Sequence, residues 1–252
     1  MQVHFIGTGD ALGSGGRLNT CFLVKTAARH FLIDCGASSM IGLQRDDVDR
    51  NRIDLILITH FHLDHFGGIP PFILDAQFVS KRTTPLTIAG PPGLPEWYAR
   101  IMETAFPGSS ATVQKFKIDF VELSPAGTRR LGDDLVVTAV PVDHGPGGPF
   151  FAYRVETAGK SIAYTGDTQW TKNLLAAGKD ADLFIAECYF MNKQVPFHLD
   201  LTTLESHLEA IAPRRLILTH MSSDLTHMSS DVLSQVDDIP HQAAHDGLVL
   251  EI

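Results

Sequence analysis

The chain has 252 residues, of which 44% are hydrophobic and 19% charged, and its formal net charge is −9 at pH 7. This composition indicates a globular protein with a sizeable core, and the acidic balance disfavours a long polyanionic partner such as a nucleic acid. The three cysteines lack CxxC spacing, no apolar run approaches the roughly 20 residues of a membrane span, and the opening MQVHFIGTGD does not resemble a signal peptide. We therefore expect a cytoplasmic protein.

Short runs rich in Ile, Leu, Val and Phe recur along the whole chain, and each ends at a turn residue or a polar cluster. Runs of this length and composition predict β-strands, several of them buried on both faces. The predicted strands are 3–7, 20–25, 30–34, 54–59, 86–90, 135–142, 150–156, 161–166, 182–187, 214–220 and 248–252.

Helices are predicted between these strands, at 67–80, 94–105, 171–178 and 201–212. The last of them opens with Thr202 followed three residues later by Glu205, which is a capping-box pattern. The segment 107–134 is polar and reads as irregular. We expect residues 1–252 to form one domain, in which two sheets pack face to face with helices outside.

Metal-binding side chains follow four of the predicted strands. The segment 58–68, ITHFHLDHFGG, holds three histidines and an aspartate within six residues, beginning at His60 directly after a strand. His144, Asp167 and His220 stand at the ends of three later strands. A single histidine at such a place is usually an ordinary surface or core residue, but this combination favours a metal site.

The spacing within the cluster suits more than one metal ion. His60 and His62 alternate in an extended segment and can face one side, whereas Asp64 and His65 follow a bend and can face a neighbouring point. A glycine pair, 67–68, then allows a tight turn into the next helix. Imidazole and carboxylate ligands suit Zn²⁺, with Mn²⁺ or Fe²⁺ as alternatives.

The segment HFHLDH resembles the HxHxDH signature of the metallo-β-lactamase superfamily, and the later His144, Asp167 and His220 occur in the matching order. The resemblance implies an α/β fold, a four-layer αββα sandwich of two mixed sheets. It also implies a dinuclear site, in which Asp167 bridges two ions. The first ion would be held by His60, His62 and His144, and the second by Asp64, His65 and His220.

A narrower resemblance is to the ribonuclease Z branch and to related cyclic-phosphate diesterases. It rests on the opening FIGTGDALGSGG and on FHLDLTTLE, with His198 ahead of a helix. It rests also on FIAECYF, which resembles the HEAT segment of that branch, with Ala186 in place of its histidine and Glu187 in place of its glutamate. In that branch the equivalent of His198 acts with the cluster aspartate, here Asp64, as proton donor to the leaving oxygen. Asp34 falls where the superfamily has an aspartate that orients a ligand imidazole, although a turn aspartate would look the same.

One departure from the branch bears on the substrate. Enzymes that process tRNA carry a long basic arm between the third metal histidine and the bridging aspartate. Here that interval runs only from His144 to Asp167, 167 − 144 = 23 positions, and has no basic cluster. We therefore expect a small anionic phosphodiester as substrate rather than tRNA, with Arg17 either contacting its phosphate or exposed to solvent. Relatives are often homodimers, and no membrane partner is expected.

The resemblance implies hydrolysis of a small or cyclic phosphodiester by metal-bound hydroxide, with His198 protonating the departing alkoxide. Two alternatives stay open. The same site could hydrolyse a carboxyl ester, lactone or thioester, which needs no acid at His198. The chain could also be a metal-binding module without catalysis, although all seven ligand residues are present.

Overall fold

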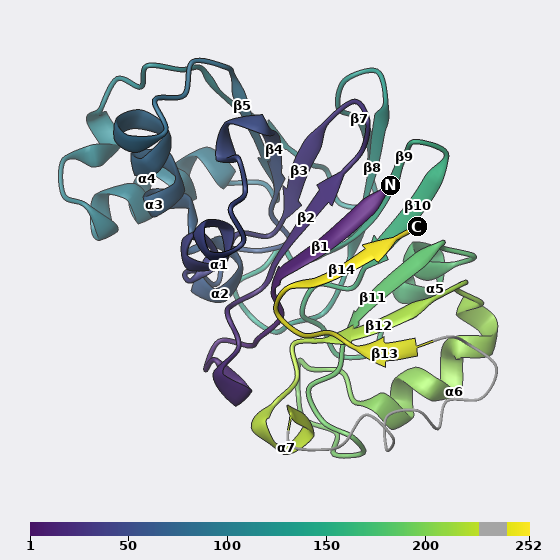
Figure 1. Ribbon diagram of the computed structural model, residues 1–252. Coiled ribbons are helices and arrows are strands. Elements are labelled where there is room, and N and C mark those ends of the chain that lie inside the picture. Colours follow the sequence, from purple (N-terminus) through teal and green to yellow (C-terminus); the bar gives the residue numbers. More distant parts are fainter. Residues whose placement is uncertain (227–240) are drawn as a thin grey trace.

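The computed structural model describes residues 1–226 and 241–252, and within them it confirms two mixed sheets packed face to face with helices outside (Figure 1). In spatial order the first sheet contains β14 (Leu248–Glu251), β1 (Gln2–Gly7), β2 (Cys21–Lys25), β3 (His30–Ile33), β4 (Ile53–Leu57), β5 (Leu86–Gly90) and β6 (Ile118–Glu122). The second contains β13 (His241–Ala243), β12 (Leu216–Thr219), β11 (Leu183–Glu187), β10 (Lys160–Tyr164), β9 (Phe151–Thr157), β8 (Leu135–Pro141) and β7 (Thr128–Arg130).

Each sheet combines an antiparallel half with a parallel half. Strands β3 to β6 run parallel in the first sheet, and β10 to β13 run parallel in the second. Strand β14 pairs antiparallel with β1, so the two ends of the chain lie side by side (Figure 1). Because parallel strands end at the same edge of their sheet, loops that are distant in sequence meet there.

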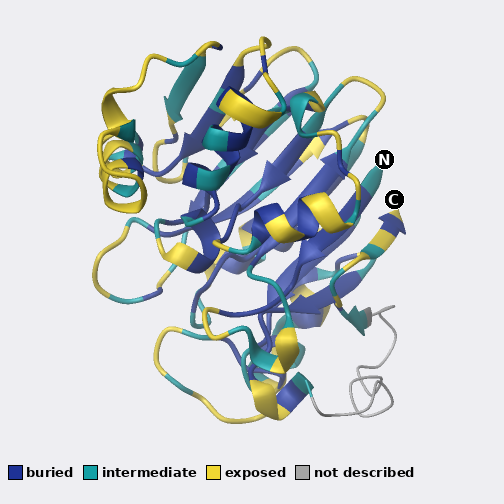
Figure 2. Ribbon diagram, turned by 60° about the vertical axis from the view of Figure 1, so that its left-hand side comes forward, coloured by how far each residue is buried: buried dark blue, intermediate teal, exposed yellow. Residues whose placement is uncertain are grey.

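The core follows the two-residue period of the strands. In β4 and the residue after it, Leu55 and Leu57 point into the space between the sheets, whereas Ile56 and Ile58 point outward against helices. All four side chains are fully buried. The central strands are accordingly buried on both faces, and many of the exposed residues lie on helices and loops (Figure 2).

Helices cover the outer face of each sheet. Those packed on the first sheet are α1 (Ser39–Arg45), α2 (Leu63–Phe66), α3 (Ile69–Leu74) and α4 (Leu94–Ala105). Those packed on the second are α5 (Asn173–Gly178) and α6 (Leu201–Ile211), and a short α7 (Ser223–Thr226) follows β12. Shorter helical turns are η1 (Ser14–Gly16), η2 (Arg50–Arg52), η3 (Asp75–Val79) and η4 (Ser109–Ala111). Across the described ranges, no helix has the length and apolarity to cross a membrane.

All the predicted strands are present, but three short ones were missed. Strands β6 and β7 lie in the segment 107–134 that read as irregular, and β13 has only three residues. Strands β6 and β7 are edge strands whose residues are exposed or half-buried, so they lack the apolar runs that reveal the central strands. The seven-residue α1 was missed as well.

Two helix boundaries differ from the prediction. The helix expected over 67–80 begins earlier, as α2, and is divided by Gly67 and Gly68 before α3. The capping-box interpretation of Thr202 was wrong. Asp200 is the N-cap of α6, and its side chain accepts a hydrogen bond of 2.9 Å from the Thr203 backbone N–H. A carboxylate at the N-cap satisfies a helix donor as well as a hydroxyl does.

The largest fully buried side chain is that of Arg82, which joins β4 and β5 by hydrogen bonds to four backbone carbonyls, those of Arg50, Ile53, Thr84 and Pro85. We expect Arg82→Met to lower the free energy of unfolding by about 3 kcal/mol. The variant removes the charged donor from the carbonyls, and water cannot reach them to replace it. Urea denaturation would measure the change. Arg214→Met, at a side chain that is 75% exposed, is the control, and equal stability of the two variants would contradict the role of Arg82.

Candidate metal centre

The seven predicted ligands converge where the strands end. His60 follows β4, His144 follows β8, Asp167 follows β10 and His220 follows β12 directly. Strand β4 belongs to the first sheet and the other three to the second, so the site lies at the shared edge of the two sheets. The remaining ligands lie in the segment between β4 and Gly67, which turns into α2 after His62.

The ligand atoms form two adjacent groups. In the first, donor atoms of His60, His62 and His144 lie within 4.8 Å of one another. In the second, the same holds for Asp64, His65, Asp167 and His220. The structure thus brings all seven residues together, while their assignment to two ions stays a prediction; two further groups of this kind join His198 to His144 and Asp167, and to Glu187 and His220.

The Asp167 carboxylate lies between the groups. One oxygen, Oδ1, is 3.2 Å from His65 Nε2, while Oδ2 is 3.2 Å from His220 Nε2 and 3.7 Å from His144 Nε2. Asp167 is 2% exposed. A buried carboxylate that faces imidazoles of both groups has the geometry that bridging two cations requires.

His60 Nε2 is buried without a hydrogen-bond partner. His65 Nε2 and Asp167 Oδ1 are also buried and lie 3.2 Å apart, but they do not meet in hydrogen-bond geometry. The other ring nitrogen of each imidazole is already engaged. His60 Nδ1 hydrogen-bonds to Thr59 Oγ1 at 3.1 Å, and His65 Nδ1 to Asp34 Oδ2 at 2.7 Å. Buried polar atoms are rarely left unpaired, so these atoms fit ligation of a divalent metal ion.

Asp34 has the position expected of an orienting group. It is fully buried after β3 and accepts hydrogen bonds from the Thr59 backbone N–H at 2.8 Å, the Thr59 hydroxyl and the His65 ring. Burial raises the pKa of Asp34, although His65 and Thr59 act in the opposite direction. In this contact the Nδ1–H of His65 donates a hydrogen bond to Asp34, and Nε2 is left facing the centre.

The carboxylates make the centre attractive to cations. Burial lowers the pKa of His60 well below its ordinary value. The pKa of His65 is instead raised well above its ordinary value, because Asp167, Asp64 and Asp34 outweigh the effect of burial. Asp167 and Asp64 likewise raise the pKa of His220 to about 9 against burial. A cation bound between these groups would replace protons as the neutralising charge.

His198 lies beside both groups. Its Nδ1 hydrogen-bonds to Glu187 Oε2 at 2.9 Å, and its ring centroid is 5.0 Å from that of His144 and 5.8 Å from that of His220. Glu187 ends β11 and is fully buried, where it also accepts a hydrogen bond from the Thr168 backbone N–H. Burial lowers the pKa of His198, but the bond to Glu187 and its charge raise it overall.

The backbone before His198 is fixed to the centre. Phe197 has a left-handed backbone with φ of 71°, and its carbonyl accepts a hydrogen bond of 2.8 Å from His144 Nδ1. The Phe197 N–H donates to Gln169 Oε1 at 3.1 Å, and Gln169 Nε2 donates to Asp143. A strained conformation held by this many contacts is typical of functional sites.

A cavity of about 200 Å³ opens onto the centre. Its lining residues are Asp10, Ala11, His62, Asp64, His144, Asp167, Tyr189, His198 and His220. The sequence did not indicate roles for Asp10 or Tyr189, although the first lies in the glycine-rich opening and the second stands two residues after Glu187.

Arg17 does not line this cavity. It is half-buried, and its pKa is lowered by burial although Asp246 and Asp10 oppose that effect. Asp246 also contacts the segments on both sides of the glycine-rich loop. It accepts hydrogen bonds from the Thr8 hydroxyl at 2.8 Å and from the Leu18 N–H at 2.8 Å. A phosphate contact by Arg17 stays a prediction.

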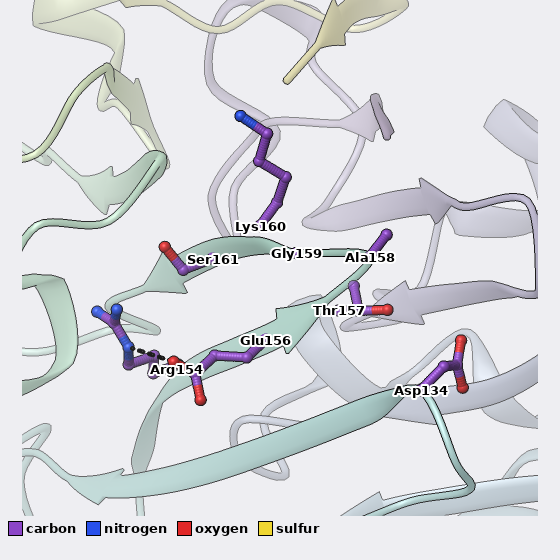
Figure 3. Close-up of a pocket in the computed structure, with 8 residues that line it drawn as sticks. All are labelled: Asp134, Arg154, Glu156, Thr157, Ala158, Gly159, Lys160 and Ser161. Carbon is purple, nitrogen blue, oxygen red and sulfur yellow. Dashed lines mark ion pairs between the residues drawn. The ribbon is translucent and has the colours of Figure 1, made fainter.

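A larger hollow of about 390 Å³ lies at the turn between β9 and β10 (Figure 3). Its charged side chains pair with their neighbours: Arg154 lies 3.5 Å from Glu156, and Lys160 lies 3.4 Å from Asp182. No histidine lines it. Because its charges are mutually neutralised and lie on a surface turn, it lacks the convergent ligands of the metal centre.

Comparison with known proteins gives a consistent set of similarities. The family model described as "Anti-Pycsar protein Apyc1" matches residues 1–235. Ribonuclease Z of Methanosarcina mazei is 27% identical over 275 aligned positions, which cover 88% of each chain. The crystal structure of the short form of human tRNase Z is 26% identical with a TM-score of 0.80, over 100% of this chain and 99% of that one. The metallo-β-lactamase fold protein YhfI of Bacillus subtilis is 20% identical with a TM-score of 0.78, over 99% of each chain.

We expect Asp34→Asn to weaken binding of Zn²⁺ by about 10–100-fold, because the neutral amide holds the Nδ1 proton and the ring of His65 less strongly than the carboxylate does. Competition with a chromophoric chelator would measure the affinity. Asp119→Asn, at a surface carboxylate paired with Lys117, should leave it unchanged. Unaltered affinity in Asp34→Asn would show that this contact does not orient a ligand.

Proposed function

The chain belongs to the family of the anti-Pycsar protein Apyc1, and from the geometry of its site we propose that it hydrolyses a small or cyclic phosphodiester. The chain is a metal-dependent hydrolase of the metallo-β-lactamase superfamily, in the ribonuclease Z-like branch. The phosphodiester class, the metal and the roles of the residues below are our proposal.

The observation that carries the proposal is the His198–Glu187 pair beside the two ligand groups. A phosphodiester with an alkoxide leaving group needs a proton at the departing oxygen, and a positioned acid typically contributes 10²–10⁴-fold. Glu187 favours the protonated imidazole. A carboxyl ester or lactone with a good leaving group makes no comparable demand, so the pair favours phosphodiesters over that alternative.

We assign one divalent ion to His60, His62 and His144, and a second to Asp64, His65 and His220, with Asp167 between them. Ions bound there would supply Lewis-acid activation of water and of the phosphoryl group. The imidazole-rich set favours Zn²⁺, with Mn²⁺ or Fe²⁺ as alternatives. Asp64 lines the cavity, so its free carboxylate oxygen can orient the attacking water.

Three observations support a small substrate over tRNA. The cavity has a volume of only about 200 Å³. The interval between His144 and Asp167, where tRNA-processing relatives carry their arm, is occupied by the hairpin of β9 and β10. The chain also carries a net charge of −9, which opposes docking of a polyanion.

Bis(p-nitrophenyl) phosphate is the first substrate to test. We expect protein loaded with Zn²⁺ or Mn²⁺ to release p-nitrophenolate, and we expect a chelator to abolish the release reversibly, because the donor atoms alone cannot activate water. Absorbance at constant pH would follow the reaction. A metal-loaded protein that leaves this diester and cyclic nucleotides intact, while it cleaves p-nitrophenyl acetate or a lactone, would overturn the proposal.

Two substrates whose leaving groups differ in basicity can separate the role of His198 from that of the metal. We expect His198→Ala to lower kcat on a cyclic nucleotide by about 10²–10⁴-fold, but to change kcat on bis(p-nitrophenyl) phosphate little, since p-nitrophenolate departs without a proton. His207→Ala, whose ring stacks on Trp170 outside the cavity, is the matched control. Equal losses on both substrates would exclude the acid role.

A further inference from the structure

Tyr189 is the one aromatic side chain other than histidine that lines the cavity, within the described part of the chain. It belongs to the loop that follows β11, two residues after Glu187. Its ring stacks on that of His198, with centroids 4.5 Å apart and an angle of 22° between the planes. Such a nearly parallel contact fixes the plane of a ring, which a single hydrogen bond does not.

The position of His198 has two kinds of support as a result. The bond from Nδ1 to Glu187 fixes one edge of the imidazole but permits rotation about that bond. Stacking on Tyr189 opposes this rotation. The backbone of Tyr189 is joined to the same loop, because its N–H donates a hydrogen bond of 2.8 Å to the carbonyl of Leu199, the residue after His198.

Tyr189 shares the wall of the cavity with Asp10, which belongs to the glycine-rich opening of the chain. Burial, followed by the charge of Asp10, raises the pKa of Tyr189. Asp10 accepts hydrogen bonds from the Ser14 N–H at 2.8 Å and the Ser14 hydroxyl at 2.7 Å, and also from the Leu12 N–H at 3.2 Å. The loop 10–16 therefore borders the cavity on which Tyr189 and His198 also lie.

We propose that Tyr189 is a positioning residue, which holds the His198 ring in the plane needed to protonate the leaving oxygen. This inference rests on the proposed phosphodiesterase activity, since it assigns His198 the role of acid. Tyr189 acts through His198 and takes no proton itself.

The test compares Tyr189→Leu, which removes the ring, with Tyr189→Phe, which keeps the ring and removes only the hydroxyl. On a cyclic nucleotide we expect kcat to fall about 10-fold or more in Tyr189→Leu and to fall less in Tyr189→Phe, because misplaced catalytic groups lose much of their effect. On bis(p-nitrophenyl) phosphate both variants should retain the wild-type kcat. Tyr98→Leu, at a tyrosine packed on Phe120 away from the cavity, is the control.

A double-variant cycle makes the assignment specific. In a His198→Ala background, Tyr189→Leu should cause no further loss on the cyclic nucleotide, since two residues acting as one unit are not additive. Additive losses, equal losses on both substrates, or wild-type rates in Tyr189→Leu would each overturn the inference. Failure of wild-type protein to cleave either diester would instead overturn the proposed function, so the two failures are distinct.

A spectroscopic readout does not depend on turnover. The ring current of Tyr189 should shift the ring-proton signals of His198 upfield, and these signals are identified by their loss in His198→Ala. We expect the shift to persist in Tyr189→Phe and to disappear in Tyr189→Leu. Should Tyr189→Leu fail to fold, Tyr189→Phe still decides the matter, because absence of the upfield shift in a folded Tyr189→Phe protein would show that the ring does not stack on His198.

Discussion

Buried nitrogen and oxygen atoms without hydrogen-bond partners are the constraint on which this molecule depends. A chain folds at a cost when it places His60 Nε2 out of water with no partner, and His65 Nε2 and Asp167 Oδ1 3.2 Å apart without a well-formed hydrogen bond. That arrangement persists only where the surrounding scaffold is rigid. Two seven-stranded sheets with a dry core between them supply the rigidity, and the strand ends carry the ligands.

Hydrogen bonds at the far side of the rings orient the ligand imidazoles. Thr59 and Asp34 hold the far nitrogens of His60 and His65, and the Phe197 carbonyl holds that of His144. Each imidazole is therefore limited in its rotation and presents its remaining nitrogen to the centre. His198 is oriented in the same way, by the hydrogen bond of its Nδ1 to Glu187. Its other ring nitrogen is left close to the cavity, where we assign it the role of an acid and not of a metal ligand.

The sequence predicted the central strands and the ligand set because both depend on strong local patterns. Buried strands appear as continuous apolar runs, and a cluster as dense in histidine and aspartate as HFHLDH points to metal ligation. The edge strands β6 and β7 lacked such a pattern. Roles for Asp10 and Tyr189 could not be predicted, because only the fold brings these residues, 189 − 10 = 179 positions apart, to the wall of one cavity. For Arg17 the sequence left a phosphate contact and solvent exposure open, and the structure places this half-buried side chain outside the cavity lining.

The pairing of β14 with β1 has a consequence for the order in which the protein becomes competent. Strand β1 is synthesised before β14, yet Thr8 and Leu18 can bond to Asp246 only once that residue has left the ribosome, and the second ligand group likewise needs His220. Folding that depends on contacts between distant residues is slow and exposes unpaired strand edges. A chain halted before His220 would therefore present β1 as an open edge and would carry an incomplete second ligand group, so it could not bind metal through the full set of donors.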